Sequence, residues 1–214
     1  MTRPGPEFIP LDDVTGIVLA GGRSSRFGSD KLAAMLDGRS LLHQALEAIA
    51  AVACTLIVVS APGVEPPLPE ALAGRVRIVH DPEPFGGPLV GLVAALAGVQ
   101  TPTVLVAGGD MPHMVPAVLL RLVAACGPAR PAVHLEVPGR IQPLPMALDV
   151  LAARTAGSAV IERGGRSLRD LLRQLGAASI PAPAWLALDP AGRTVTDVDR
   201  PGDLDRAENF RPAN

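Results

Sequence analysis

Residues 19 to 31, with the sequence LAGGRSSRFGSDK, combine paired glycines with cationic side chains directly after an apolar run. Consecutive glycines let successive backbone N–H groups turn toward one point without a Cβ in the way, which suits an anion. Three positive charges follow within nine residues, from Arg23, Arg26 and Lys31. The stretch therefore predicts a site for a polyphosphate, although a solvated basic turn would use the same residue types.

The spacing of this loop excludes two common phosphate-binding motifs. A Walker loop has Lys directly after its last glycine, whereas Ser29 and Asp30 separate Gly28 from Lys31. A dinucleotide-binding fingerprint requires G-x-G-x-x-G, which the segment GGRSSRFG does not contain. The chemistry of the loop must therefore be identified from the elements and motifs around it.

Apolar strand-like runs alternate with segments of helical spacing, which predicts βαβ units around a mostly parallel sheet. The expected fold is a single α/β domain, Rossmann-like, with helices flanking the sheet over residues 14–210 after an N-terminal extension at 1–13. Pro-rich stretches at Ala61–Gly74 and Asp81–Pro88 are expected to be surface loops that either shape a ligand site or simply connect elements. The predicted strands are Gly16–Ala20, Thr55–Ser60, Arg75–Val79, Thr103–Ala107, Ala132–Glu136 and Pro143–Leu148, and the predicted helices Ser40–Ala53, Pro88–Gly98, Met114–Ala125 and Ser167–Leu175, with a short one opening at Pro201.

Composition narrows the classes of partner. Lys and Arg number 19 against 21 Asp and Glu, and only five of 214 residues are aromatic, so neither a basic stripe nor a stacking platform for nucleic acid is expected. Long apolar stretches are interrupted before the ~18 residues of a membrane span, and no secretory signal is visible. The expected location is the cytoplasm. Cys54 and Cys126 have neither zinc-ligand spacing nor a disulfide framework around them.

The glycine-rich loop resembles the signature of the nucleotidyltransferases, and within them most closely that of the molybdenum cofactor guanylyltransferases. The matching elements of the loop are LAGG at Leu19–Gly22, RFG at Arg26–Gly28 and DK at Asp30–Lys31. Four further segments resemble the family pattern in the same order along the chain: DPEPFGGPLVGL at Asp81–Leu92, GGDMP at Gly108–Pro112, RIQPLPMAL at Arg140–Leu148 and TDVDRPGDL at Thr196–Leu204. The resemblance covers most of the chain and implies the nucleotidyltransferase fold.

The resemblance also implies roles for individual residues. Arg26, Lys31 and Asp110 would be catalytic, with Mg²⁺ held by Asp110 and, from the far side, by Asp199. The predicted nucleotide-binding residues are Leu19, Ala20, Gly21, Gly22, Lys31, Ser60, Asp81 and Asp110. Two positions depart from the family pattern, because Ser60 and Asp199 stand where many members carry Asn.

Several of these assignments have structural alternatives. Asp110 follows the fourth predicted strand, where a carboxylate would reach the carboxyl edge of the sheet and offer Mg²⁺ a hard oxygen ligand, but Asp-x-Pro also begins helices well. Asp81 before Pro82 is equally a turn-forming residue. Arg166 is expected mainly to pack, with contact to the second substrate's phosphate as the alternative. The four histidines share no spacing and are assigned no catalytic task.

The implied reaction transfers GMP from GTP to molybdopterin bearing molybdenum and releases pyrophosphate. The implied partners are therefore GTP, the molybdenum cofactor and, transiently, molybdoenzymes or the preceding proteins of cofactor synthesis. Alternatives are a cytidylyltransferase acting on the same pterin, a sugar-phosphate nucleotidyltransferase, and a non-catalytic nucleotide-binding module.

Overall fold

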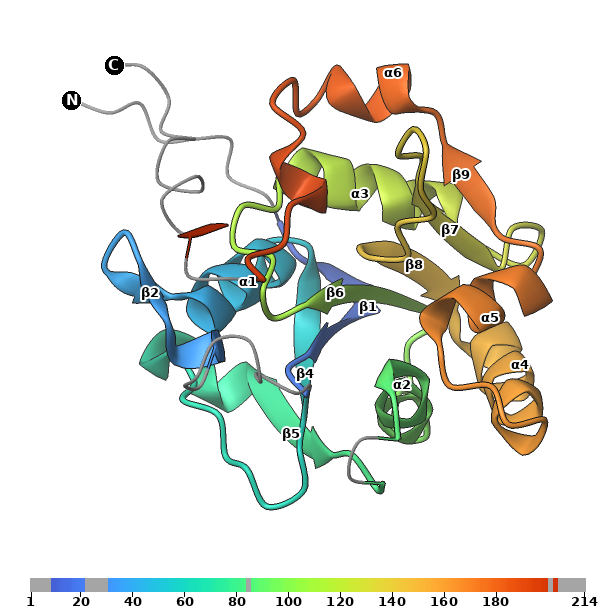
Figure 1. Ribbon diagram of the computed structural model, residues 1–214, viewed down its shortest axis with the longest axis horizontal. Helices are drawn as coiled ribbons and strands as arrows, with labels where there is room; N and C mark the ends of the chain where they lie inside the picture. The colour runs from blue at the N-terminus through green and yellow to red at the C-terminus, as the bar shows by residue number, and fades with distance from the viewer. Residues whose placement is uncertain (1–8, 22–30, 84–85, 200–201, 204–214) are drawn as a thin grey trace.

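The computed structural model describes residues 9–21, 31–83, 86–199 and 202–203. Its centre is a seven-stranded sheet with the order β5-β4-β1-β6-β8-β7-β9 (Figure 1). β8 pairs antiparallel with both of its neighbours, and the remaining pairs are parallel. The strands are β1 (Leu11–Leu19), β4 (Ala53–Ser60), β5 (Val76–His80), β6 (Thr103–Gly108), β7 (Ala132–Leu135), β8 (Met146–Asp149) and β9 (Ala178–Ile180).

Helices cover both faces of this sheet (Figure 1). Buried side chains of α1 and α3 pack on one face, and those of α2, α4 and α5 pack on the other. The helices are α1 (Leu41–Ala50), α2 (Pro88–Leu96), α3 (Pro116–Ala125), α4 (Val150–Glu162), α5 (Leu168–Gln174) and α6 (Ala182–Leu186). The 3-10 turns are η1 (Lys31–Ala33), η2 (Glu70–Arg75) and η3 (Arg193–Val195), and a small separate hairpin consists of β2 (Met35–Leu36) and β3 (Arg39–Ser40).

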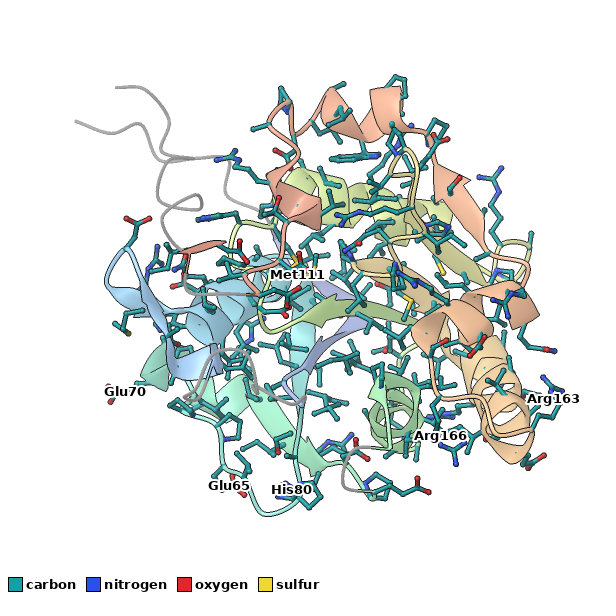
Figure 2. The ribbon with its side chains drawn as sticks, viewed as in Figure 1. Glu65, Glu70, His80, Met111, Arg163 and Arg166 are labelled. Atoms are coloured by element: carbon teal, nitrogen blue, oxygen red, sulfur yellow. The ribbon has the colours of Figure 1, made fainter. Side chains whose placement is uncertain are left out.

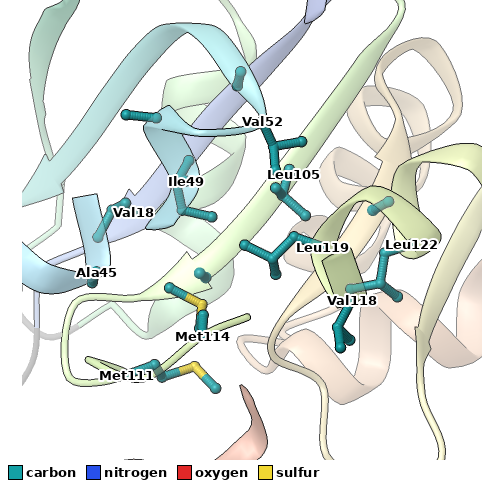
Figure 3. Packing of buried hydrophobic residues seen from close by; sticks show 14 of the residues in the cluster. Val18, Ala45, Ile49, Val52, Leu105, Met111, Met114, Val118, Leu119 and Leu122 are labelled. Atoms are coloured by element: carbon teal, nitrogen blue, oxygen red, sulfur yellow. The ribbon is translucent and has the colours of Figure 1, made fainter. Parts of the chain in front are cut away.

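The inner strands are apolar on both sides because both sides are covered. In β1, Ile17 joins the cluster under α2 and α4, whereas the next residue, Val18, joins the cluster under α1 and α3. Figure 3 shows the cluster under α1 and α3. In it, Val18 of β1 and Ile49 of α1 lie near Met111 and Met114, which belong to the loop after β6. This loop is thereby anchored in the core at the carboxyl end of the sheet.

The six predicted strands and four predicted helices are present, and the α/β class with a mostly parallel sheet is confirmed. The first strand is longer than predicted, because the Leu11 N–H donates to the Val52 carbonyl at 2.8 Å and extends the pairing with β4. The predicted helix Ser40–Ala53 ends three residues early, since Ala53 already belongs to β4. The predicted helix start at Pro201 lies outside the described residues.

Helix α4 was not predicted from the sequence. It follows β8 directly, and the Asp149 carboxylate caps it by accepting the Ala152 N–H at 2.9 Å. Because one residue both ends the strand and caps the helix, no Gly or Pro marks the boundary. In the part of the chain that the structure describes, no helix is long and apolar enough to cross a membrane.

Candidate active site

The carboxyl ends of β1, β4 and β6 meet at one rim of the sheet. The Ala20 N–H donates to the Val59 carbonyl at 2.7 Å, and the Gly109 N–H donates to the Leu19 carbonyl at 3.0 Å. These bonds fix the residues Leu19–Gly21 between the neighbouring strand ends, where open α/β sheets bind ligands. Gly22 and Arg26, the next predicted site residues, lie outside the described residues.

The chain returns to this rim at η1, which Lys31 begins. Leu32 packs over Gly109, and a Cβ added to that glycine would lie 3.2 Å from the Leu32 Cδ2 atom. Lys31 is therefore one residue from a segment in contact with the loop that carries Asp110. The two described ends of the glycine-rich segment, Leu19–Gly21 and the turn η1, and the acidic loop, which is about 80 residues further along the sequence, are neighbours at the same strand ends.

Asp110 lies two residues beyond the end of β6, with its side chain folded over Gly108. A Cβ at Gly108 would stand 2.5 Å from the Asp110 Oδ1 atom, a distance that real Cβ contacts do not reach. The following Met111 is 2% exposed and anchors the loop in the core. The GGDMP segment thus combines a small residue that makes room for the carboxylate with an apolar anchor that holds it at the rim.

The C-terminal segment brings two more carboxylates to Asp110. The N–H of buried Val198 donates to the Asp110 carbonyl at 3.0 Å. Burial raises the pKa of Asp197, and the negative charges of Asp199 and Asp110 raise it further, whereas Arg140 opposes the shift. Negative charge is concentrated at this point, because three acidic side chains influence one another and one arginine partly offsets them.

A buried hydrogen-bond bridge holds the C-terminal segment against the loop after β6. Asp189 and Thr194 are both 0% exposed. Asp189 Oδ2 accepts the Thr194 N–H at 2.7 Å and its hydroxyl at 2.8 Å, and Thr194 Oγ1 accepts the Val115 N–H at 3.1 Å. Asp189 Oδ1 is also 3.5 Å from Arg193 Nε. Together with the Val198 bond, this bridge ties Asp110 and the chain that follows it, as far as Val115, to the segment that carries Asp197 and Asp199.

The predicted nucleotide contacts Ser60 and Asp81 lie at the carboxyl ends of two neighbouring strands, because Ser60 is the last residue of β4 and Asp81 follows β5. Ser60 is 1% exposed, and its hydroxyl lies 3.0 Å from the Nδ1 atom of His80. The Asp81 carboxylate accepts the Glu83 N–H at 3.1 Å, which is the turn contact that its residue type also predicts. Its second oxygen lies 3.4 Å from the position of a Cβ on Gly91 in α2, so the carboxylate lies beside the first turns of that helix.

Arg166 is engaged in packing the neighbouring loops. Its Nη1 atom donates to the carbonyls of Ile161 and Gly165, each at 3.0 Å, and its own carbonyl accepts the Leu89 N–H at 3.3 Å. A Cβ on Gly87, whose φ is +92°, would lie 2.8 Å from that carbonyl. These contacts support the packing role expected for Arg166, which Figure 2 shows beside α2 and α4.

Asp189, Thr194 and His80 belong to this region although no sequence motif marks them. Asp189 lies before the 3-10 turn η3 and Thr194 lies within it, and their importance follows from their complete burial, which no local sequence pattern indicates. His80 lies just beyond the predicted strand Arg75–Val79 and ends β5, and its partner Ser60 is 20 residues away. Only the parallel pairing of β4 with β5 places them opposite each other.

A mostly parallel sheet with acidic residues and a glycine-rich segment at its carboxyl rim is typical of a nucleotide-binding α/β protein, and comparison with known proteins identifies it as a nucleotidyltransferase and gives its family. Residues 16–179 match the family described as MobA-like NTP transferase domain. The chain is 34% identical to a probable molybdenum cofactor guanylyltransferase of Chloroflexus aggregans over 198 residues, covering 89% of this chain and 91% of the relative. It is 36% identical over 158 residues to the molybdenum cofactor guanylyltransferase of Xanthomonas euvesicatoria, covering 73% of this chain and 75% of that protein. The chain therefore belongs to the MobA-like NTP transferase family.

Solved structures agree on the fold. A molybdopterin-guanine dinucleotide biosynthesis protein A from Archaeoglobus fulgidus superposes with a TM-score of 0.74 at 24% identity, covering 92% of this chain and 97% of that one. A 2-C-methyl-D-erythritol 4-phosphate cytidylyltransferase from Thermus thermophilus superposes with a TM-score of 0.67 at 18% identity, covering 91% and 96%. Proteins named for different nucleotides thus share this fold, and the choice of nucleotide depends on the site.

Proposed function

We propose that this protein transfers GMP from GTP to the terminal phosphate of molybdopterin bearing molybdenum, with release of pyrophosphate. The relatives at about one-third identity are named for this guanylyl transfer. The observation that carries the proposal is the meeting of residues Leu19–Gly21, the turn η1 and the Asp110 loop at one rim of the sheet. We infer that a nucleoside triphosphate would bind at this rim, between the acidic loop and the cationic residues that follow Gly21 in sequence.

The attacking group in this reaction is a phosphate oxygen that is already ionised near neutral pH, so the enzyme needs no general base. The main barrier is the repulsion between two anions, and positioning with charge neutralisation dominates catalysis of related phosphoryl transfers. Backbone N–H groups of Gly21 and Gly22 would hold the triphosphate. Arg26 and Lys31 would offset negative charge on the triphosphate and on the departing pyrophosphate.

The residues at the rim fit a magnesium ion. Among the described residues, no group of three or more acidic, cysteine or histidine side chains has the arrangement of an all-protein metal site. Mg²⁺, however, is usually held by one or two carboxylates together with substrate phosphates and water. Asp110 and Asp199 would supply those carboxylates, and Asp197 adds negative charge beside them. The bound ion would neutralise charge on the phosphate oxygens.

Cytidylyl transfer is the second candidate, because Asp199 stands where the guanylyltransferase pattern has Asn, and Asp is more familiar there in cytidylyltransferases. A comparison of GTP, CTP, ATP and UTP with Mg²⁺ by thermal shift tests the choice, since the preferred nucleotide stabilises the fold most. Larger stabilisation by CTP would contradict the guanylyltransferase assignment. Tight GTP binding without pyrophosphate release, in the presence of molybdenum-bearing molybdopterin, would favour a binding module.

Asp110→Ala and Lys31→Ala test the catalytic roles in a pyrophosphate-release assay with that acceptor. Loss of one preorganised charge contact typically lowers the rate by about 10²–10³, and we expect a loss of this size in each variant with the fold intact. Asp13→Asn is the matched control, because Asp13 is exposed near the opposite, N-terminal end of β1. Near-wild-type turnover of either site variant would contradict the assigned roles.

A further inference from the structure

Arg140 is an exposed cationic residue in the loop between β7 and β8. In the sheet order β6-β8-β7, β8 pairs antiparallel with both of its neighbours, so the carboxyl ends of β6 and β7 lie at the same rim (Figure 1). Met146, the first residue of β8, pairs with Val106 of β6 and with His134 of β7. The loop that carries Arg140 therefore lies at the rim that carries Asp110, two strands away from it.

The C-terminal segment joins Arg140 to the acidic loop. Arg140 Nη2 donates to the Val195 carbonyl at 3.5 Å, and the Val198 N–H donates to the Asp110 carbonyl at 3.0 Å. Three residues span at most about 11 Å when the chain is fully extended, so both contacts fall within that length of one segment. The guanidinium is also close enough to Asp197 to oppose the rise in the pKa of that carboxyl group. Arg140 thus places a positive charge beside the proposed magnesium ligands.

Contacts on both sides hold the loop that carries Arg140. Near its beginning, the Glu136 carbonyl accepts the Nε1–H of Trp185 in α6 at 2.9 Å. One residue beyond the arginine, the Ile141 carbonyl accepts the Nε–H of Arg169 in α5 at 3.2 Å. The arginine therefore extends from a backbone that α5 and α6 hold, which lowers the entropic cost of ordering it around a ligand.

Most N–H groups of the Arg140 guanidinium have no protein acceptor among the residues that the structure describes. A guanidinium has five N–H donors, and the bond to the Val195 carbonyl uses one of them at a long distance. By contrast, Arg75, Arg154 and Arg166 each donate to at least two backbone carbonyls. A planar guanidinium with several available donors matches the oxygens of a phosphate group, which it can bind in pairs.

We propose that Arg140 binds the terminal phosphate of the acceptor substrate and places it opposite the nucleotide. This inference rests on the proposed function and deepens it. Residues Leu19–Gly21 lie on the β1 and β4 side of the Asp110 loop, whereas Arg140 lies on the β8 and β7 side. β1 and β7 are three strands apart, or about 14 Å at the usual strand spacing, which leaves room for two substrates to meet above β6.

The acceptor phosphate must approach both the nucleotide and the carboxylates of Asp110, Asp197 and Asp199, all of which repel it. One of its oxygens forms a bond to the α-phosphorus of the nucleotide. The bond from that phosphorus to the bridging oxygen breaks, and pyrophosphate leaves with the electron pair. A guanidinium stays protonated near neutral pH, so Arg140 lowers the repulsion without taking part in proton transfer.

Phosphate binding beside a filled nucleotide site tests this proposal without catalysis. The protein is saturated with Mg²⁺ and with the α,β-methylene analogue of whichever nucleotide stabilises it most, which cannot release pyrophosphate, and inorganic phosphate is titrated by calorimetry. The variants are Arg140→Gln and Arg140→Lys, of which the second keeps the charge but not the planar fork. Arg130→Gln is the matched control: exposed Arg130 forms a β-bridge with Gly127 at the other end of β7, as Arg140 does with Val137.

We expect Arg140→Gln to weaken phosphate binding by about 10–100-fold, the value of a hydrogen bond between charged groups. Arg140→Lys should recover part of this loss, and Arg130→Gln should bind phosphate like the wild type. Equal phosphate binding by the wild type and Arg140→Gln would overturn the proposal, as would absence of phosphate binding by the wild type. An equal loss of affinity for the nucleotide analogue and for phosphate would also overturn it, because it would indicate a merely structural role.

Turnover with molybdenum-bearing molybdopterin separates this proposal from the proposed function. Arg140→Gln should raise the KM for that acceptor by about 10–100-fold and leave the KM for GTP unchanged. A wild type that binds phosphate through Arg140 but does not transfer GMP to the pterin contradicts the proposed function and leaves the role of Arg140 intact. A protein that transfers GMP and whose Arg140→Gln variant keeps the KM for the acceptor contradicts only the role of Arg140.

Discussion

Thr194→Val removes one oxygen from the buried bridge and tests how strongly the bridge supports the fold. The side chain keeps its volume and shape, so packing changes little at a position that is 0% exposed. Two hydrogen bonds are lost: the hydroxyl no longer donates to Asp189 Oδ2, and the Val115 N–H no longer has Thr194 Oγ1 as its acceptor. The Thr194 N–H still donates to Asp189, so the carboxylate retains one partner.

The expected loss of stability is about 3 kcal/mol. A hydrogen bond to a charged group contributes about 1.5–3 kcal/mol, and a buried N–H left unpaired costs about 1–3 kcal/mol. The two contributions are not fully additive, because the loop can relax once the first bond is lost. For a chain of this size, each kcal/mol lowers the Tm by about 2–4 °C, so the expected decrease is about 6–12 °C.

Urea unfolding and thermal melts of the wild type, Thr194→Val and Thr194→Ser measure this effect. The serine variant keeps the hydroxyl and loses one methyl group, so it should retain most of the stability that the valine variant loses. A valine variant as stable as the serine variant would refute the reasoning, because the hydroxyl would then contribute nothing. If the bridge also positions the acidic segment, the valine variant should need more Mg²⁺ for half-maximal stabilisation in the same melts.

Three further variants test other parts of the structure. Asp197→Asn should raise the Tm at pH 7 without divalent cations and have little effect near pH 4. The pKa of Asp197 is raised in the folded protein, so the wild type loses stability as the pH rises from the ordinary pKa of 3.8 toward the pKa of the folded state. Equal Tm changes at both pH values would contradict this. Ser167→Ala removes the cap that accepts the Asp170 N–H at 3.1 Å, and urea unfolding should show a loss of about 1 kcal/mol. Gly16→Ala places a Cβ 2.2 Å from the Ile49 Cγ2 atom, so melts should show a loss of about 1–3 kcal/mol, which Gly74→Ala, with open space around it, should not share.

Predictions from the sequence were accurate where one segment carries the whole signal. Continuous apolar runs identified the buried inner strands β1, β4 and β6, because burial on both faces leaves no polar alternation. Short elements such as β9 escaped prediction, since three residues carry too little periodicity. The helix α4 escaped because its cap, Asp149, also ends a strand.

In the candidate site, too, the features carried by one contiguous segment could be predicted from the sequence, and the contacts between distant segments could not. Motifs at Leu19–Gly22 and Gly108–Pro112 could be matched to a family pattern because each is a contiguous stretch whose residue types suit phosphate and metal chemistry. The supporting contacts could not be predicted in this way. Thr194 reaches Val115 across 79 residues of sequence, and His80 reaches Ser60 across 20.

The sequence by itself determined the class of this protein. Apolar runs, glycine pairs and isolated acidic residues act through local steric and solvation preferences, which operate within a few positions and can be recognised without the fold. The tertiary structure alone decided which polar groups are buried and which partners they have. Asp189 holds the C-terminal segment through Thr194, and Ser60 lies beside His80, because distant segments pack together at these places. This packing excludes water from Asp189 and Ser60, so that each can pair only with the partners that the fold provides.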